Sequence, residues 1–435
     1  GLCGEVREPT KFEPLVPKFE VEDALDCRNY CCIDYQACRG AFKVYFVSGS
    51  SAEERSLIHQ KCIRNDTGAW YESELVTTDL SEACLVFVSI GHGIQRTTDC
   101  FTQISSLPSW NTFGEQGRNH VIWSASDDGI DAETRKKYFG FAAFAQAHDD
   151  YLRHVPAMDV AISLRAGGKG SDSKVVKELS KSLSKFSAQN RKWLLTFKGT
   201  GSNEVREFAR RFHNVSERIC ILNLPLSCSN RLSNRDLTYC KIREREYHRF
   251  SYDDLFNTTF GLVIPGRSPA TFRLHEILAT GCIPVFYAFD DYPLPYEDII
   301  PWGDFSIVAP RKVDFQHVLI PLLNRLKKSP RLLSMQQSVK KYNELYFSQG
   351  YEQSKLAVME IFRQRFEMRT SSRDYRVIRN GCSGKQVRED TPPFESGPDL
   401  KIWYLVAFLI TTLSLFYFVK SMSVGGNHLQ KSMTP

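Results

Sequence analysis

The sequence lacks the residue spacings of two common kinds of metal site. None of its 13 cysteines belongs to a Cys-x-x-Cys pair, and no Asp-x-Asp occurs anywhere in the 435 residues. Adjacent acidic residues such as Asp127 and Asp128 would point to opposite faces of a strand. We therefore expect neither a structural zinc site nor a carboxylate-bound Mg²⁺ or Mn²⁺, and predict no metal cofactor.

The sequence also has little excess of one charge sign. Lys and Arg number 56 and Asp and Glu number 50, so the net charge is only +6 and is spread along the chain. A nucleic-acid-binding protein would show a clustered basic face, so no nucleic-acid partner is expected. Hydrophobic residues make up 42% and charged residues 24%, which is ordinary globular composition. The length suits two domains, or three.

Cysteine, by contrast, is abundant, and four residues cluster near the start: Cys27, Cys31, Cys32 and Cys38. Such a cluster is typical of a disulfide framework. Three Asn-x-Ser/Thr sequons fit N-linked glycosylation: Asn65, Asn214 and Asn257. Together these features predict that the globular part folds in the lumen of the secretory pathway.

One uncharged run predicts a membrane span. Residues 402–419 contain no charge and lie between Lys401 and Lys420, and 18 residues reach the lower limit for a transmembrane helix. A buried core helix is the alternative, but the run has no polar stripe and follows a polar linker. The sequence begins at Gly1 rather than Met, so we expect a signal peptide or signal anchor to be missing from it.

Short apolar runs alternate with longer helix-capable stretches in two halves of the chain. Buried strands are expected at 42–47, 84–90, 120–123 and 159–164, and again at 193–197, 219–222, 260–264 and 283–287. This alternation predicts an α/β fold with parallel sheets, arranged as two facing Rossmann-like domains. Such folds bind ligands in the crevice at the carboxyl ends of the strands.

The predicted organisation has eight parts. They are a flexible N-terminal segment (1–25), a first Rossmann-like domain (26–165), a Gly-, Ser- and Lys-rich flexible linker (166–190), a second Rossmann-like domain (191–350), a closing helix (351–369), a polar linker (370–401), the transmembrane helix (402–419) and a short tail (420–435).

The second half contains the strongest candidate site. A Pro-Gly-Arg loop follows the strand 260–264 and leads into a helix, so backbone N–H groups there suit a diphosphate. Arg267 and Arg273 can add bidentate contacts to phosphate. Glu276 lies on the same helix face as Arg273 and can accept hydrogen bonds from ribose hydroxyls. The alternative is an Arg–Glu pair on a solvated helix. Lys198 is either a second phosphate contact or a surface lysine at a turn.

The first half offers weaker candidates. Arg118, Asn119 and His120 cluster before a strand, where Asn and His suit sugar hydroxyls or, alternatively, stabilise a loop through hydrogen bonds. Asp159, at the start of a strand, is a candidate base or a structural cap. His92 stands between two glycines after a strand, and is a second candidate base.

At these residues the chain resembles the exostosin family of glycosyltransferases. The matching runs keep the family's order over residues 27–367: Phe42-Lys-Val-Tyr45, Ala83-Cys-Leu-Val-Phe-Val-Ser89, Leu107-Pro-Ser-Trp110, Gly117-Arg-Asn-His-Val-Ile122, Met158-Asp-Val160, Phe197-Lys-Gly199, Phe256-Asn-Thr-Thr-Phe260, the Gly-Arg loop, Thr271-Phe-Arg273, Glu276, Gly281-Cys-Ile-Pro-Val285 and Leu294-Pro-Tyr-Glu297.

The resemblance implies a GT-B-like inverting glycosyltransferase in the Golgi or endoplasmic reticulum membrane. It implies transfer of glucuronic acid from UDP-glucuronate, a UDP-sugar donor, to a growing heparan sulfate chain. The second domain would bind the donor through Lys198, Arg267, Arg273 and Glu276, and the first domain would line the acceptor. The family's second transferase domain has no room before residue 402. The family pattern also suggests disulfides Cys27–Cys32, Cys38–Cys84 and Cys228–Cys240, whereas Gly261 stands where Cys282 would have its partner.

Three departures from the family pattern leave an alternative open. The loop 265–268 has one arginine, Thr200-Gly201 replaces a basic turn, and acidic residues are missing from 90–95. Fewer cations would weaken UDP binding. The alternative is a catalytically weak or inactive exostosin subunit that forms a hetero-oligomer with an active family member and stabilises it.

Overall fold

The structure is a computed structural model. It describes residues 33–34, 37–38, 40–64, 73–90, 98–113, 117–126, 129–147, 154, 158–164, 174–183, 187–201, 203–225, 228, 237–266, 268–348 and 351–370. By its contacts the chain divides into two units at residue 382, and all the described residues belong to the first unit.

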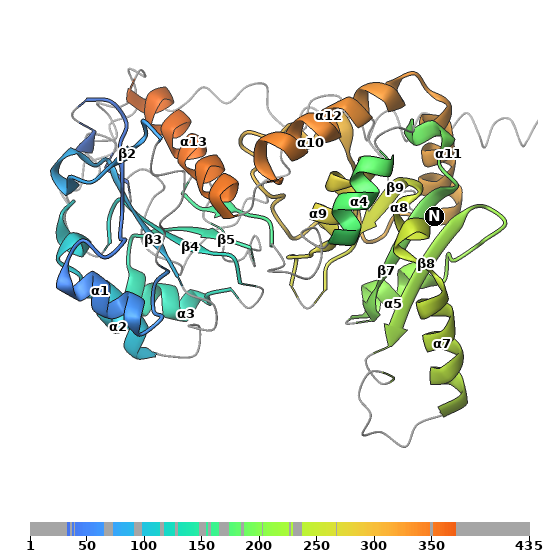
Figure 1. Ribbon diagram of the computed structural model, residues 1–435, viewed down its shortest axis with the longest axis horizontal. Helices are drawn as coiled ribbons and strands as arrows, with labels where there is room; N and C mark the ends of the chain where they lie inside the picture. The colour runs from blue at the N-terminus through green and yellow to red at the C-terminus, as the bar shows by residue number, and fades with distance from the viewer. Residues whose placement is uncertain are drawn as a thin grey trace, which may run out of the picture. The chain divides into compact units, whose positions relative to one another are not determined.

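The first sheet has six parallel strands in the order β2-β1-β3-β4-β5-β6 (Figure 1). The strands are β1 (Val44–Phe46), β2 (Val76–Thr77), β3 (Leu85–Ser89), β4 (His120–Ser124), β5 (Ala143–Gln146) and β6 (Val160–Ala161). The helices between them are α1 (Ala52–His59), α2 (Thr98–Ser105) and α3 (Ala132–Thr134), with a π-helical turn at Arg135–Phe139 and 3₁₀ turns at Leu80–Glu82 and Pro108–Asn111.

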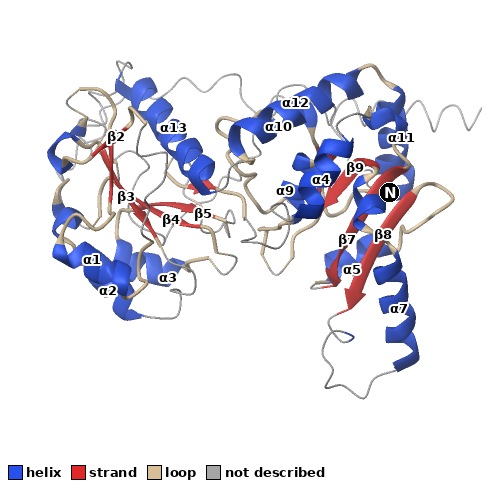
Figure 2. Ribbon diagram, viewed as in Figure 1, coloured by secondary structure: helices blue, strands red, loops and turns tan. Residues whose placement is uncertain are grey.

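The second sheet has five parallel strands in the order β11-β10-β9-β7-β8 (Figure 2). They are β7 (Trp193–Gly201), β8 (Ile219–Pro225), β9 (Thr258–Val263), β10 (Ile283–Tyr287) and β11 (Ile307–Ala309). The helices are α4 (Lys174–Leu183), α5 (Glu204–Arg210), α7 (Leu237–Arg249), α8 (Tyr252–Phe256), α9 (Arg273–Ala279), α10 (Trp302–Phe305), α11 (Ile320–Lys328) and α12 (Arg331–Tyr346), with a 3₁₀ turn at Ala188–Asn190 and a π-helical turn at Phe315–Leu319.

Both faces of the first sheet are buried, as parallel sheets require. Alternate strand residues point to opposite faces, so Val86 and Val88 pack with Leu57 of α1 and Phe101 of α2. Leu85 and Phe87 belong to the other cluster, which also contains the last helix, α13 (Tyr351–Thr370). Continuous apolar runs, rather than alternating ones, therefore identify these strands.

The last helix follows the second sheet in sequence but packs on the first (Figure 1). Near its start, the Tyr351 ring meets the Trp123 ring of β4 edge-on at 5.2 Å. Near its end, the Phe366 ring lies 5.3 Å from that of Phe42, which precedes β1. Helix α13 therefore runs from the carboxyl edge of the first sheet, where its strands end, to the amino edge, where they begin.

Two parallel α/β sheets in one chain are consistent with the GT-B-like fold expected from the sequence. Sequence patterns missed β2, β5 and β11, and the strand expected at 159–164 contains only Val160–Ala161. Within 166–190, expected to be a flexible linker, residues Lys174–Leu183 instead form α4, which buries Val176, Leu179 and Leu183. The other boundaries of the eight predicted parts stay a prediction.

None of the helices in the described part of the chain is long and apolar enough to cross a membrane. The predicted span at 402–419, the flexible segment 1–25 and the tail 420–435 lie outside the described residues.

Candidate functional site

Arg273 and Glu276 form a buried ion pair beyond the carboxyl end of β9. Both belong to α9, and the Arg273 Nη1 and Glu276 Oε2 atoms pair directly. Arg273 also donates through Nη2 to the Lys198 carbonyl at 2.7 Å. Glu276 is only 3% exposed, and its burial raises the pKa of the carboxyl, while Arg273 acts in the opposite direction. The alternative of a solvated Arg–Glu pair is therefore wrong.

Lys198 lies inside β7 rather than after it. Its ammonium donates to the Phe250 carbonyl at 2.6 Å and sits 4.6 Å from the centre of the Tyr247 ring. Burial and the nearby Arg273 lower the pKa of Lys198. The side chain is therefore not a surface lysine at a turn, because it holds the corner between α7 and α8 and adds positive charge beside Arg273.

Arg206 is a functional candidate that sequence reasoning missed. From α5 it donates to the carbonyls of Thr200, Ile264 and Pro265 at 3.0–3.1 Å. Burial, with a contribution from Arg273, lowers the pKa of Arg206 to about 10. Asn203, the N-cap of α5, donates to the Pro265 and Gly266 carbonyls as well. These two side chains fix the loop that leads into α9. Arg267 lies outside the described residues.

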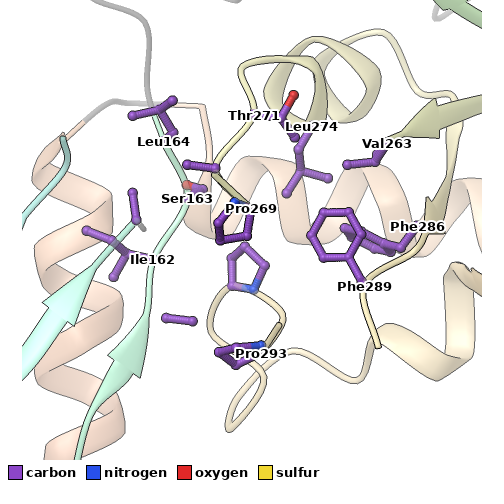
Figure 3. A pocket seen from close by; sticks show the side chains of 14 residues that line it. Ile162, Ser163, Leu164, Val263, Pro269, Thr271, Leu274, Phe286, Phe289 and Pro293 are labelled. Carbon is purple, nitrogen blue, oxygen red and sulfur yellow. The ribbon is translucent and has the colours of Figure 1, made fainter. Parts of the chain in front are cut away.

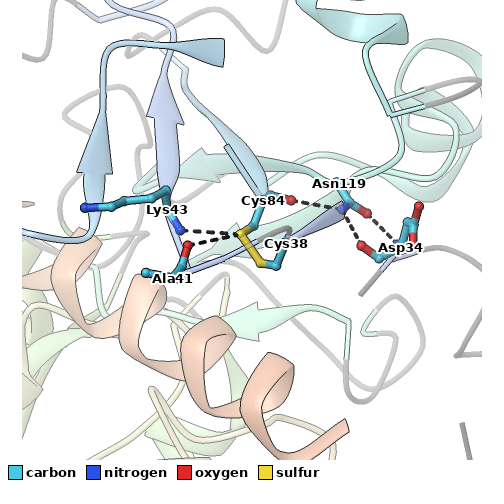
Figure 4. Close-up of a disulfide and its surroundings, with 6 residues drawn as sticks. All are labelled: Asp34, Cys38, Ala41, Lys43, Cys84 and Asn119. Carbon is cyan, nitrogen blue, oxygen red and sulfur yellow. Dashed lines mark hydrogen bonds between the residues drawn. A yellow bond between two sulfur atoms is a disulfide. The ribbon is translucent and has the colours of Figure 1, made fainter. Parts of the chain in front are cut away.

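Asn119 is part of the scaffold of the first sheet (Figure 4). It has a left-handed backbone with φ +56°, which Asn tolerates better than most residues, and is 1% exposed. Its Oδ1 accepts from the Asp34 N–H at 2.6 Å, and its Nδ2 donates to the carbonyls of Asp34 and Cys84 at 2.8 and 2.9 Å. The structure therefore corrects the expectation that Asn119 binds a sugar and matches the loop-stabilising alternative.

His120 and Arg118 are corrected in the same way. His120 is fully buried, its Nδ1 lies 2.9 Å from the Arg118 carbonyl, and its ring packs 4.6 Å from that of Trp110. Burial lowers the pKa of His120 to about 4. The Arg118 guanidinium lies 5.8 Å from the centre of the Phe141 ring. Because this segment precedes β4, it lies at the amino edge, opposite to the edge where such sheets bind ligands.

Asp159 is held in a buried ion pair. Its Oδ2 is 2.7 Å from Arg135 Nη2, and its Oδ1 accepts from the Phe144 N–H at 2.8 Å. The side chain is completely buried directly before β6, level with Phe144 inside the sheet. A catalytic base must reach the proton that it removes, so the structure corrects the base assignment in favour of a structural role. His92, the second candidate base, lies outside the described residues.

With this geometry in place, comparison with known proteins identifies the family. The family model of the Exostosin GT47 domain matches residues 39–326. The chain belongs to the exostosin GT47 family. This is a family of glycosyltransferases, and the match contains both sheets, the buried pair on α9 and the loop that Arg206 holds.

Exostosin relatives cover most of this chain. Exostosin-1 of Drosophila melanogaster is 29% identical over 373 residues, 78% of this chain and 45% of its own length. Exostosin-1a of Danio rerio is 28% identical over 360 residues, 78% of this chain and 46% of its own length. Exostosin-1 of Mus musculus is 27% identical over 362 residues, 78% of this chain and 45% of its own. The chain thus spans about half the length of the curated relatives it matches.

Two disulfides expected from the exostosin pattern are present, Cys38–Cys84 and Cys228–Cys240. A third, Cys62–Cys100, was not expected, because the pairing depends on how α1 and α2 pack. Cys27 and Cys32 lie outside the described residues.

Cys282 is buried and free. At Gly261, a Cβ atom would lie 2.5 Å from Ile277, so Ile277 fills the space that a cysteine side chain at this position would need.

The glycosylation sites stay predictions in this exostosin chain. Asn214 and Asn257 are both half-buried. The side-chain Oδ1 of Asn214 accepts from the Ser216 hydroxyl at 2.6 Å, and the side-chain Oδ1 of Asn257 accepts from the Lys192 N–H at 3.1 Å. Asn65 lies outside the described residues.

Among the described residues of this exostosin chain, no three His, Cys, Asp or Glu side chains gather as metal ligands would. What the site offers instead is a group of cations beside one buried ion pair, because burial and then the charge of Arg273 lower the pKa values of Lys198 and Arg206. Such an arrangement suits an anionic ligand with sugar hydroxyls.

Proposed function

We propose that the chain transfers glucuronic acid from UDP-glucuronate to a growing heparan sulfate chain in one inverting step. The acceptor hydroxyl attacks the anomeric carbon as the bond to UDP breaks, and its proton passes to a base. The observation that carries the proposal is the buried Arg273–Glu276 pair at the carboxyl edge of the second sheet. Arg273 would face the diphosphate, and Glu276 would accept from the ribose hydroxyls.

The electrostatics of the second sheet support this donor site. Besides burial, which is the larger cause, the charge of Arg273 lowers the pKa of both Lys198 and Arg206, so Arg273 repels each of them. A bound diphosphate would reverse this repulsion and so stabilise the ligand and the leaving group. Arg267 would add to the same charge. On this proposal UDP binding raises the pKa values of the cluster, because its cationic forms then gain an anionic partner.

The donor site is tested with the full chain and a matched pair of double variants. Arg273→Ala with Glu276→Ala removes the buried pair, while Glu360→Ala with Arg363→Ala removes a partly exposed pair of the same kind on α13. Calorimetry should show loss of UDP binding in the first variant and unchanged binding in the second. Acceptor-dependent release of UDP, with and without EDTA, measures transfer. Transfer retained by the first variant would refute the donor-site assignment.

One observation supports the alternative function, that of a catalytically inactive subunit. Asn119, His120 and Asp159 are all buried in the scaffold, and the Lys198 ammonium is occupied by the Phe250 carbonyl. Because these groups bond within the fold, they are not available to substrates. This favours a subunit that has kept donor binding and lost transfer, and that stabilises an active family member in a hetero-oligomer. Such a subunit would bind UDP without releasing it from UDP-glucuronate, and its co-expression would raise the activity of the partner.

We also propose that the globular part lies in the lumen of the Golgi or endoplasmic reticulum, attached to the membrane. Three disulfides in the described residues support this location, because disulfides persist in oxidising compartments. Protease protection of the tagged full chain in sealed microsomes would test it.

A further inference from the structure

A line of buried hydrogen bonds connects the helix of the candidate donor site to the first sheet. His275 Nε2 lies 2.9 Å from Ser163 Oγ, which lies 3.5 Å from the Tyr296 hydroxyl. Tyr296 donates to Ser354 Oγ at 2.8 Å. The same oxygen accepts from Trp123 Nε1 at 3.3 Å. We call these five residues the buried relay, because each of them is at most 6% exposed.

The members of the buried relay come from five separate segments. His275 lies on α9, Ser163 follows β6, Tyr296 follows β10, Ser354 lies on α13 and Trp123 on β4. Tyr296 also donates its backbone N–H to the carbonyl of Ala161, the last residue of β6. The relay therefore joins the second sheet, the carboxyl edge of the first sheet and the last helix at one place.

The surroundings of the buried relay are apolar. Ser163 lines a small pocket whose other walls include Ile162, Leu164, Pro269, Leu274 and Pro293 (Figure 3). The pocket has room for only a water molecule or two, so it is too small for a nucleotide sugar. Apolar contacts alone would permit sliding at this place, because they have no preferred direction. Hydrogen bonds in such a setting are directional and costly to break.

We propose that His275, Ser163 and Tyr296 are positioning residues, which fix the donor-binding helix α9 against the acceptor-side sheet. His275 lies between Arg273 and Glu276 in sequence, so any shift of His275 moves the donor pair with it. The inference rests on the proposed function, and it predicts that transfer needs the buried relay whereas UDP binding does not. Transfer depends on the distance between two bound reactants, and a displacement of about 1 Å can cost on the order of a hundredfold in rate.

The test removes one oxygen atom from the full chain. Tyr296→Phe deletes the hydroxyl in the middle of the relay. Tyr287→Phe is the matched control, because Tyr287 is as buried as Tyr296 but its hydroxyl donates to the carbonyl of Arg311, just after β11. We expect both variants to bind UDP like the parent. Only Tyr296→Phe should lower kcat, by about tenfold or more, with KM for the donor unchanged.

Hydrogen exchange gives a readout that does not need transfer. In Tyr296→Phe the amides of 161–164 and of the first turn of α13 should exchange about tenfold faster, because a broken buried hydrogen bond eases local opening. Tyr287→Phe should leave these amides unchanged. Unchanged exchange in Tyr296→Phe, or equal acceleration in both variants, would overturn the proposal. If the parent binds UDP but transfers nothing, the proposed function fails and exchange alone decides on the relay.

A second pair of variants covers the case in which Tyr296→Phe does not fold. His275→Gln keeps a side-chain group that can hydrogen-bond to Ser163, whereas His275→Leu removes it at similar volume. Rescue of kcat and of amide protection by Gln relative to Leu supports positioning through the hydrogen bond. Equal loss in both variants would show that the relay does not act through this bond, which contradicts the proposal.

Discussion

The two sheets use their charged and polar side chains differently. In the first sheet, Asn119 and His120 lie at the amino edge of β4, whereas Asp159 lies inside the sheet beside Phe144, and all three bond to the scaffold. In the second sheet, Arg273 and Glu276 follow a strand and lie at the carboxyl edge. Bonding within the fold therefore marks the first group as scaffold, while Arg273 and Glu276 lie at the edge where such sheets bind ligands.

Charge balance shows the same contrast. The buried Arg135 of the first sheet has the carboxylate of Asp159 at 2.7 Å. In the second sheet, Lys198 and Arg206 both lie close to Arg273, and of these three described residues only Arg273 is shown to pair with Glu276. A neutral pair stabilises the scaffold it belongs to, whereas a surplus of one sign favours a ligand of the opposite sign. The following four predictions test this division between the sheets.

The largest effect is expected from Asp159→Asn, which leaves the buried Arg135 without its carboxylate. Breaking a buried ion pair in this way costs about 3–5 kcal/mol in the free energy of unfolding. Urea unfolding followed by circular dichroism measures it. The second sheet provides the control, Asp254→Asn, which breaks the exposed pair with Lys192 and should cost less than about 1 kcal/mol. Equal losses would contradict the contrast.

Removing the disulfides should also affect the two sheets unequally. Cys38–Cys84 closes a sequence separation of 46 residues and Cys228–Cys240 one of 12. The chain-entropy model gives losses of about 4 and about 3 kcal/mol for the two double Cys→Ala variants. Urea unfolding of both under oxidising conditions compares them. A larger loss for the shorter loop would mean that native packing, rather than chain entropy, sets the order.

The pH dependence of stability should trace mainly to His120. Its pKa is about 4 in the folded protein and 6.5 when unfolded. Between these values only the unfolded state binds the proton, so stability is full above pH 6.5 and decreases as the pH falls towards 4. From about pH 7 to about pH 5 the expected loss is about 2 kcal/mol. His120→Gln should remove this slope in urea unfolding, and an unchanged slope would assign it elsewhere.

The smallest effect is expected on ligand affinity. Glu276→Gln should weaken UDP binding about tenfold, because an amide cannot pair with Arg273 and accepts from ribose hydroxyls less strongly than a carboxylate. Glu54→Gln is the control from the first sheet, since Glu54 is equally buried and accepts from the N–H groups of Gly49 and Ser50. Calorimetry with UDP compares the two. Weakened binding in Glu54→Gln alone would reverse the assignment of the sheets.

The sequence predicts the fold well where strands are long and rich in β-branched and other apolar residues. The runs around β3, β4, β7 and β10 are continuous and apolar, and each forms a buried strand. β5 was missed because its sequence, Ala-Phe-Ala-Gln, has little strand preference. α4 was missed because the Lys and Ser residues around it resemble a linker, although its three buried apolar residues follow helical spacing.

The candidate site was predictable only where its parts lie near one another in sequence. The Arg273–Glu276 pair follows from helical spacing. Arg206 does not, because the carbonyls that it holds at Pro265 and Ile264 are 59 and 58 residues away. Likewise Asn119 bonds to Asp34 across 85 residues, so the sequence left its loop-stabilising role as an alternative and could not name its partner.

The last helix brings the two ends of the described chain to one place. Phe366 near the end of α13 meets Phe42 just before β1, and Arg365 donates to the carbonyls of Met158 and Asp159 before β6. A tether joined to the protein at either end would therefore pull on the amino edge of the first sheet. The carboxyl edge of that sheet, where α13 begins at Tyr351, lies away from this point.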